Sequence, residues 1–171
     1  MRKRTGAPFS MPMQKTNNRQ FEQDWGDLRS RLRTEFLNRG SVSEQKCEKL
    51  LMDARWPDGM QCCSCGSDLL TRIPTRNTYK CKECDYQQSL TAGSIFHSSH
   101  KPLTLWFEAA ATLIDAHARE RGSLWTIQRF GEAFDLAYIS ARRIRGTILD
   151  DLHSPDGILE AIVCVPFRPD S

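Results

Sequence analysis

The sequence lacks any run of about 18 to 20 consecutive apolar residues, the length that a helix needs to cross a membrane. Its basic N-terminus is not followed by the apolar core of a secretory signal peptide. It also has no internal repeat, no low-complexity tract, no glycine-rich phosphate loop and no paired nucleophile and base. These absences predict a cytoplasmic protein that has no membrane contact, no small-molecule substrate and no catalytic residues.

Composition and charge limit the remaining possibilities. Hydrophobic residues make up 39% of the 171 residues, which is low for a globular protein and predicts a modest core. The formal net charge of +3 is too small to prove a nucleic-acid partner, so its distribution matters more. Residues 1–40 hold nine Lys and Arg against four Asp and Glu, whereas residues 41–153 balance at fourteen each. We expect residues 1–17 to form a mobile basic leader that contacts phosphate, or a solvated tail without a role.

Four of the seven cysteines form two Cys-x-x-Cys pairs, Cys62 with Cys65 and Cys81 with Cys84. Two thiolates three positions apart can hold a tetrahedral ion from one tight turn, and a second pair returned by a hairpin completes the shell. A disulfide framework is the alternative, but an odd number of cysteines without a signal peptide favours a reduced compartment. The pattern therefore predicts one structural Zn²⁺ per chain.

Other possible ligands lie nearby. Cys63 is inside the first pair and competes with Cys62, although Cys62 has the spacing that matches the second pair. His97 and His100 also have ligand-like spacing, but four sulfurs already complete a structural site. Three β-prone runs around the cysteines predict the antiparallel strands of a zinc ribbon, at residues 69–73, 78–79 and 86–91.

Helical patterns flank this ribbon. An amphipathic helix is expected within residues 18–40, because five apolar residues recur at helical spacing: Phe21, Trp25, Leu28, Leu32 and Phe36. That stripe either packs on its own chain or contacts a second copy or another protein. A capping box from Ser41 to Glu44 predicts a helix that ends near Ala54, and Pro102 begins another that runs towards Gly122.

Residues 125–152 have the spacing of a helix-turn-helix. Gly131, a small residue, is followed four positions later by Asp135, which tolerates a left-handed turn, and then by Ala141 and Ile144. The apolar stripe of the second helix should face inward: Ala137, Ala141, Ile144, Ile148 and Leu152. The candidate DNA-contacting residues are Gln128, Tyr138, Ile139, Arg142 and Arg143. The alternative is that Arg142, Arg143 and Arg145 only solvate a surface helix. Because Asp150 and Asp151 at the far end of the helix would repel phosphates, DNA contact is expected in its first two turns.

The sequence therefore predicts an α+β fold, with a small antiparallel zinc ribbon flanked by helices and followed by a helical helix-turn-helix bundle. The expected organisation is a leader (1–17), an amphipathic helix (18–40), a helix plus the ribbon (41–100), the bundle (101–153) and a C-terminal tail (154–171). Residues 157–166 are apolar and should form a short strand or dock back on the core.

Several short segments resemble the N-terminal part of a bacterial family of insertion-sequence transposases, which have a zinc ribbon ahead of a DDE-type nuclease. The similar segments are 55–59, 62–67, 79–84, 89–96, 102–103 and 106–107, within a stretch of roughly residues 43 to 150. In that family the ribbon and the following helices bind transposon ends, which implies a role in DNA binding here. One departure is Cys63, where the family usually has proline. The residues after Leu152 do not supply the family's catalytic domain, so we expect no enzyme activity.

The leading hypothesis is a zinc-dependent, sequence-specific protein that binds double-stranded DNA and is derived from a transposase. It would act on the nucleoid as a transcriptional regulator, or as a regulator or accessory of transposition. One alternative is a zinc-ribbon module that binds proteins such as RNA polymerase, and another is a non-catalytic subunit of a split transposase. Binding of the isolated protein to duplex DNA separates the first hypothesis from the protein-binding module.

Overall fold

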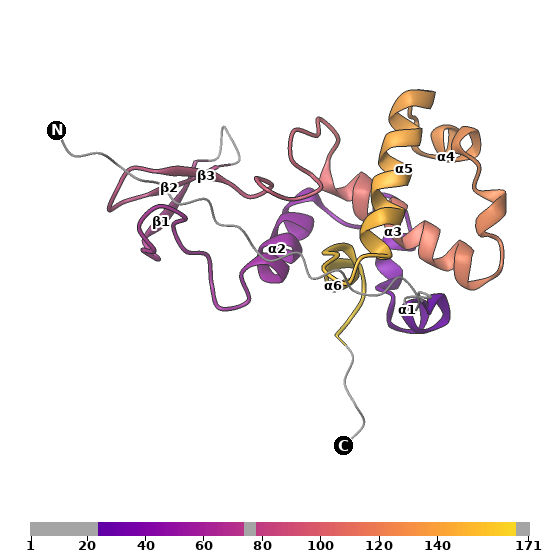
Figure 1. The fold of residues 1–171 in the computed structure, drawn as a ribbon, viewed down its shortest axis with the longest axis horizontal. Coiled ribbons are helices and arrows are strands. Elements are labelled where there is room, and N and C mark those ends of the chain that lie inside the picture. Colours follow the sequence, from indigo (N-terminus) through magenta and orange to yellow (C-terminus); the bar gives the residue numbers. More distant parts are fainter. Residues whose placement is uncertain (1–23, 74–77, 167–171) are drawn as a thin grey trace, which may run out of the picture.

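The computed structural model describes residues 24–73 and 78–166. A small antiparallel sheet lies at one end of the molecule and a group of helices forms the other, with one helix between them (Figure 1). The predicted α+β fold class is confirmed. Among the described residues, no helix is both long and apolar enough to cross a membrane.

The N-terminal segment differs from the continuous helix expected over residues 18–40. It contains helix α1 (Trp25–Arg31) and a 3-10 turn, η1 (Thr34–Leu37). The chain is extended between them because it pairs with the C-terminal segment: Leu32 forms a β-bridge with Cys164, and the Arg33 N–H donates to the Val163 carbonyl at 2.8 Å. Phe21 lies outside the described residues.

The apolar residues of this segment pack on their own chain. Leu28, Leu32 and Phe36 are buried in the common core, and Trp25 packs against it. The alternative use of this stripe, as a contact for a second copy or another protein, is therefore wrong for the three buried residues, because their side chains are already covered.

Helix α2 (Glu44–Arg55) lies between the sheet and the other helices (Figure 1). Its cap is Ser43, which accepts from the Lys46 N–H, and not Ser41 as the capping box predicted. The Glu44 carboxylate instead accepts from the N–H groups of Leu103 and Thr104, at 2.7 and 3.0 Å. These bonds satisfy the free donors at the start of the next helix and fix α2 against it.

The sheet is the predicted three-stranded ribbon. Its strands are β1 (Leu70–Ile73), β2 (Thr78–Cys81) and β3 (Gln87–Ser89), and they pair antiparallel in sequence order. The turn expected between the first two strands, residues 74–77, lies outside the described residues.

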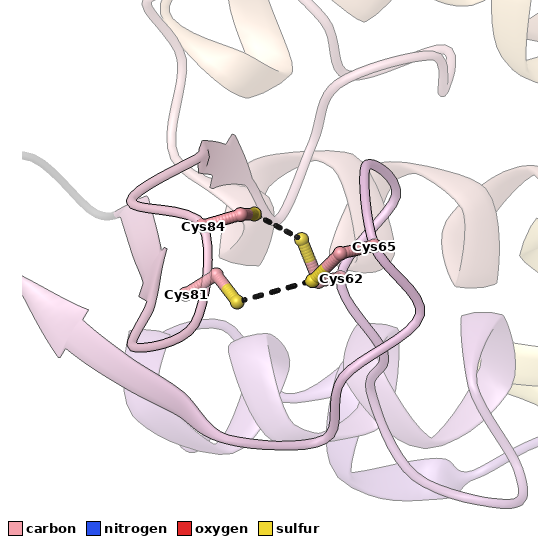
Figure 2. A group of neighbouring side chains, drawn as sticks. All are labelled: Cys62, Cys65, Cys81 and Cys84. Atoms are coloured by element: carbon pink, nitrogen blue, oxygen red, sulfur yellow. Dashed lines mark hydrogen bonds between the residues drawn. The ribbon is translucent and has the colours of Figure 1, made fainter.

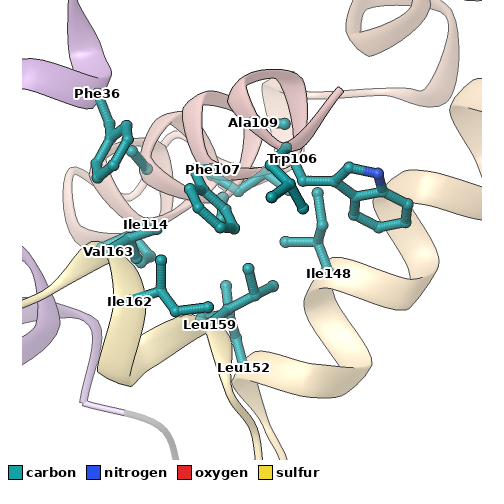
Figure 3. Packing of buried hydrophobic residues seen from close by; sticks show 14 of the residues in the cluster. Phe36, Trp106, Phe107, Ala109, Ile114, Ile148, Leu152, Leu159, Ile162 and Val163 are labelled. Carbon is teal, nitrogen blue, oxygen red and sulfur yellow. The ribbon is translucent and has the colours of Figure 1, made fainter. Parts of the chain in front are cut away.

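Helix α3 (Leu103–Ala118) is at the centre of the helical part and is followed by the 3-10 turn η2 (Gly122–Leu124). Figure 3 shows its side chains Trp106, Phe107 and Ile114 against residues of the two last helices. The expected helix towards Gly122 ends earlier because Glu120 takes a left-handed backbone, with φ of 58°.

Helices α4 (Ile127–Phe134) and α5 (Tyr138–Leu152) are joined by a three-residue turn. Asp135 has the left-handed conformation expected of it, with φ of 50°. A Cβ atom on Gly131 would lie 2.9 Å from the Leu136 carbonyl oxygen, so only glycine fits this crossing without a shift. Ala141 is buried as expected, but Ala137 is exposed because it is the residue before the first turn of α5.

The C-terminal tail forms a short helix, α6 (Leu159–Val163), where a short strand was one expectation. The other expectation, an apolar end docked on the core, is correct, since Leu159, Ile162 and Val163 are fully buried. The Asp151 carboxylate accepts from the N–H groups of Ile158 and Leu159, at 3.2 and 2.8 Å. Asp151 is therefore a buried structural group, and the prediction that it repels phosphate was wrong.

Candidate metal centre and nucleic-acid interface

The two cysteine pairs of the ribbon meet at one point. Figure 2 shows Cys62 and Cys65, which precede β1, facing Cys81 and Cys84 at the end of β2 and in the turn after it. The Sγ atoms of Cys62 and Cys84 are 3.6 Å apart, as are those of Cys65 and Cys81, and all four lie within 4.8 Å of one another. A tetrahedral ion with Zn–S bonds of about 2.3 Å needs sulfurs about 3.8 Å apart. The four residues are therefore positioned to hold one structural Zn²⁺.

Both cysteine pairs lie in turns of the same kind. The Gly66 N–H donates to the Cys62 carbonyl at 2.8 Å, and the Asp85 N–H donates to the Cys81 carbonyl at 3.2 Å. Gly66 and Asp85 both have a left-handed backbone, with φ of 76° and 59°. Glycine takes this conformation without a steric cost, and aspartate is among the few other residues that accept it.

Hydrogen bonds within the cluster give the thiols of Cys62 and Cys65 different pKa values. Burial raises the pKa of Cys62, but N–H groups of Cys65 and Ser64 and the neighbouring thiols outweigh it and lower that pKa to about 7. The Ser67 N–H lowers the pKa of Cys65, yet its hydrogen bonds to the other thiols, chiefly Cys84, and burial together raise it to about 12. The thiol of Cys62 is therefore more acidic than that of Cys65. Because a metal binds thiolates, loading the whole site must release protons.

Cys63 lies outside the four-sulfur group and is exposed. Its N–H donates to the side-chain carbonyl of Gln88 at 2.9 Å, and the Gln88 amide donates to the Gln61 carbonyl at 3.0 Å. Gln88 is buried and ties the first cysteine turn to β3, a role that sequence reasoning missed because a glutamine in a short strand looks like a surface residue. His97 and His100 also lie outside the group. In the described parts of the chain, the four cysteines are the one cluster of three or more potential metal ligands.

Two arginines attach the ribbon to the helices. Arg55 lies over the Trp56 ring and donates to the carbonyls of Leu90 and Ala92, the second at 2.6 Å. Arg72 of β1 forms a 2.7 Å ion pair with Glu48 of α2. These contacts couple the metal centre to the start of the helical core.

The predicted DNA-contacting residues lie on α4 and α5. Gln128 and Tyr138 line the same shallow hollow, although Gln128 also donates to Glu132 of its own helix. Ile139 is 82% exposed, so its side chain can contact a ligand on this face. Arg142 and Arg143 are exposed on the same helix.

Most arginines of the described chain form hydrogen bonds or ion pairs that hold the fold together. Arg145 is one of them, because it donates to the Trp125 carbonyl at 2.8 Å. Arg145 therefore does not share the solvated role considered for all three α5 arginines. No hydrogen bond or ion pair to the side chains of Arg142 or Arg143 occurs within the described residues.

The carboxylate of Glu160 in α6 has a partner within the fold. Glu160 forms a 2.8 Å ion pair with Arg31, which Asp27 contacts at 2.6 Å. Asp156 is exposed and does not belong to a ligand cluster.

The ribbon and its four sulfurs define a zinc-ribbon protein. Residues 42–87, which include α2, β1, β2 and all four cysteines, match the family model of the transposase zinc-ribbon domain of the IS1595 type. The resemblance drawn from the sequence is confirmed over this stretch.

A relative extends this similarity beyond the ribbon. Over 125 residues the chain is 29% identical to a Halobacterium salinarum protein described as an uncharacterized protein in transposable element ISH50. The alignment covers 71% of this chain and 40% of that protein, so the chain matches less than half of the relative's length. The relative is archaeal, so the similarity is not confined to bacteria. No solved structure matches the chain.

Proposed function

We propose that this chain is a zinc-dependent, sequence-specific DNA-binding protein derived from a transposase. In this proposal α4 and α5 form a helix-turn-helix, and α5 enters the major groove. The observation that supports it most strongly is the exposed face of α5, where two unpaired arginines lie beside exposed Tyr138 and Ile139.

The composition of this face suits contact with base pairs. Arginine can make bidentate hydrogen bonds to guanine, and an aliphatic side chain can contact the methyl group of thymine. Arg142 and Ile139 supply these two groups one turn apart on α5. The side chains of Arg142 and Ile139 are exposed, so both can contact base pairs.

Contact should concentrate in the first half of α5. Gln128 of α4 and Tyr138 share a hollow there and can contact the phosphates that flank the groove. Asp150, at the other end of α5, is exposed and would repel phosphate. Asp151 adds no repulsion at the surface, since its carboxylate is turned inward to α6.

We further propose that the protein acts by occupying DNA rather than by cutting it. Two-metal cleavage needs several convergent carboxylates, and Asp115, Asp151 and Glu160 each have a structural partner. Occupancy on the nucleoid would regulate transcription or transposition, and the same binding would serve a subunit of a split transposase. The N-terminal segment does not support the protein-binding alternative, because its residues Leu28, Leu32 and Phe36 are buried.

The test begins with selection of bound sequences from a random duplex pool by the full, zinc-loaded chain. The affinity for the selected duplex is then compared between the parent and the double variant Arg142→Ala, Arg143→Ala. Loss of an arginine that contacts guanine should cost about 1–3 kcal/mol and relax the preference at that position. The control removes the same charge elsewhere, with Lys46→Ala and Lys49→Ala on the exposed side of α2, and should bind nearly as the parent.

Two results would contradict the proposal. If the double variant binds as tightly as the parent, α5 is not the contacting helix. If the selected duplex is nicked or joined in magnesium or manganese, and Glu160→Ala abolishes this, the protein is an enzyme.

A further inference from the structure

A hollow of about 200 Å³ lies beside the face of α5 just described. One wall is the segment between β3 and α3, which runs between the ribbon and α5 (Figure 1). The other wall is the second and third turns of α5, and Trp106 of α3 also lines it. The polar residues that line it include His97, Ser98, His100, Lys101, Ser140 and Arg143.

The segment that forms the first wall is fixed by contacts with α3. The Phe96 ring meets the Trp106 ring edge-on, with ring centres 5.5 Å apart, and also the Phe107 ring at 5.7 Å. The Ser99 hydroxyl accepts from the Trp106 indole at 3.2 Å and from the Lys101 N–H at 3.1 Å. These contacts hold the backbone of the segment in place, so its side chains have a fixed arrangement along the hollow.

The hollow is basic and hydrogen-bond donating. It is lined by a lysine, an arginine and two histidines but by no carboxylate, although residues 41–153 carry equal numbers of basic and acidic side chains. The side chains of Lys101 and Arg143 form no hydrogen bond or ion pair within the described residues. A ligand that satisfied these groups would be an anion with several acceptor oxygens, and the hollow has room for one phosphate.

We propose that this hollow binds one backbone phosphate of the duplex that α5 contacts. The inference rests on the proposed DNA-binding function and adds a second element, residues 97–101, to the interface. It also separates the roles of two neighbouring arginines. Arg143 faces the hollow and holds the phosphate, while Arg142, about 100° further round the helix, is left for the bases.

The experiment measures the affinity of the full, zinc-loaded chain for its selected duplex at several salt concentrations. Loss of one phosphate contact lowers the slope of log K against log salt by about 0.9. Lys101→Ala should lower the slope by up to that amount. Both Lys101→Ala and the pair His97→Gln, His100→Gln should weaken the selected and scrambled duplexes alike. Arg142→Ala should instead reduce the preference between the two duplexes. Lys49→Ala on α2 is the control for charge and should leave the slope unchanged.

The results distinguish failure of the phosphate site from failure of the proposed DNA-binding function. If the parent prefers no duplex, the proposed function fails. If the parent binds selectively but Lys101→Ala leaves the slope unchanged and the histidine pair leaves the affinity unchanged, only the phosphate site fails.

A second measurement keeps the test independent of variants. The imidazole NMR signals of His97 and His100 should shift when the selected duplex is added. Inorganic phosphate at the same ionic strength should not shift them to the same degree. Equal shifts with inorganic phosphate would identify a general anion site and overturn the assignment to DNA.

Discussion

Two cysteines in the first turn of the ribbon, Cys63 and Cys65, differ in their role. Cys65 is one of the four convergent sulfurs, whereas the Cys63 side chain is exposed and outside the group. We predict that Cys65→Ser loses the zinc and the fold of the ribbon, because metal binding supplies about 10–16 kcal/mol to small sites of this kind. Cys63→Ser is the matched control and should retain one zinc per chain. Elemental analysis and circular dichroism of both variants check this, and a zinc-free Cys63→Ser protein would show that the ligand set is wrong.

Asp151 and Asp150 form a second matched pair of neighbours. The buried carboxylate of Asp151 accepts from two N–H groups that precede α6, whereas Asp150 is exposed. Asp151→Ala should lower the free energy of unfolding by about 2–4 kcal/mol, because two donors lose their acceptor. Asp150→Ala should change it by less than about 0.5 kcal/mol. Urea unfolding measures both, and equal effects would mean that Asp151 does not hold α6 in place.

At the scale of elements, the crossing of α4 and α5 depends on one glycine. A Cβ atom on Gly131 would meet the Leu136 carbonyl oxygen at 2.9 Å and the Ala141 side chain at 3.3 Å, whereas one on Gly146 would meet nothing within 4 Å. Both substitutions to alanine gain the same helix propensity, about 1 kcal/mol. Only Gly131→Ala overpacks the crossing, so it should be less stable than Gly146→Ala by about 1–3 kcal/mol. Thermal unfolding of the two variants measures this difference. Equal stability of Gly131→Ala and Gly146→Ala would mean that the crossing of α4 and α5 has room for a side chain at position 131.

The elements that could be predicted from sequence are those fixed by local rules. The cysteine spacing predicted where the four sulfurs meet, and Asp135 predicted the turn between α4 and α5, because each pattern has few structural solutions. The missed features depend on partners far away in the chain. The break after α1 follows from pairing of Leu32 with Cys164, and Glu44 caps α3, 59 residues further on. A local pattern does not contain such partners.

At the scale of the whole molecule, two parts are stabilised in different ways. The ribbon contributes few residues to the apolar core, whereas α3, α5 and α6 pack closely together (Figure 3). Removal of zinc with a strong chelator should therefore abolish amide protection in residues 62–89 and leave α3 and α5 protected. Leu90 and Phe96 belong to the core and limit the unfolding at that end. Hydrogen exchange with and without the chelator gives the result, and an unchanged ribbon would show that zinc does not hold it.

The central claim is that the intact molecule distinguishes one DNA sequence from others. The most direct measurement titrates the zinc-loaded chain with the selected duplex and with a scrambled duplex of the same composition, at one salt concentration. Specific binders exceed their own non-specific affinity by about 10³- to 10⁷-fold. We expect a ratio of at least about 10³ between the two duplexes, and a smaller ratio for Arg142→Ala. Equal affinity for both duplexes would mean that the protein does not recognise a DNA sequence.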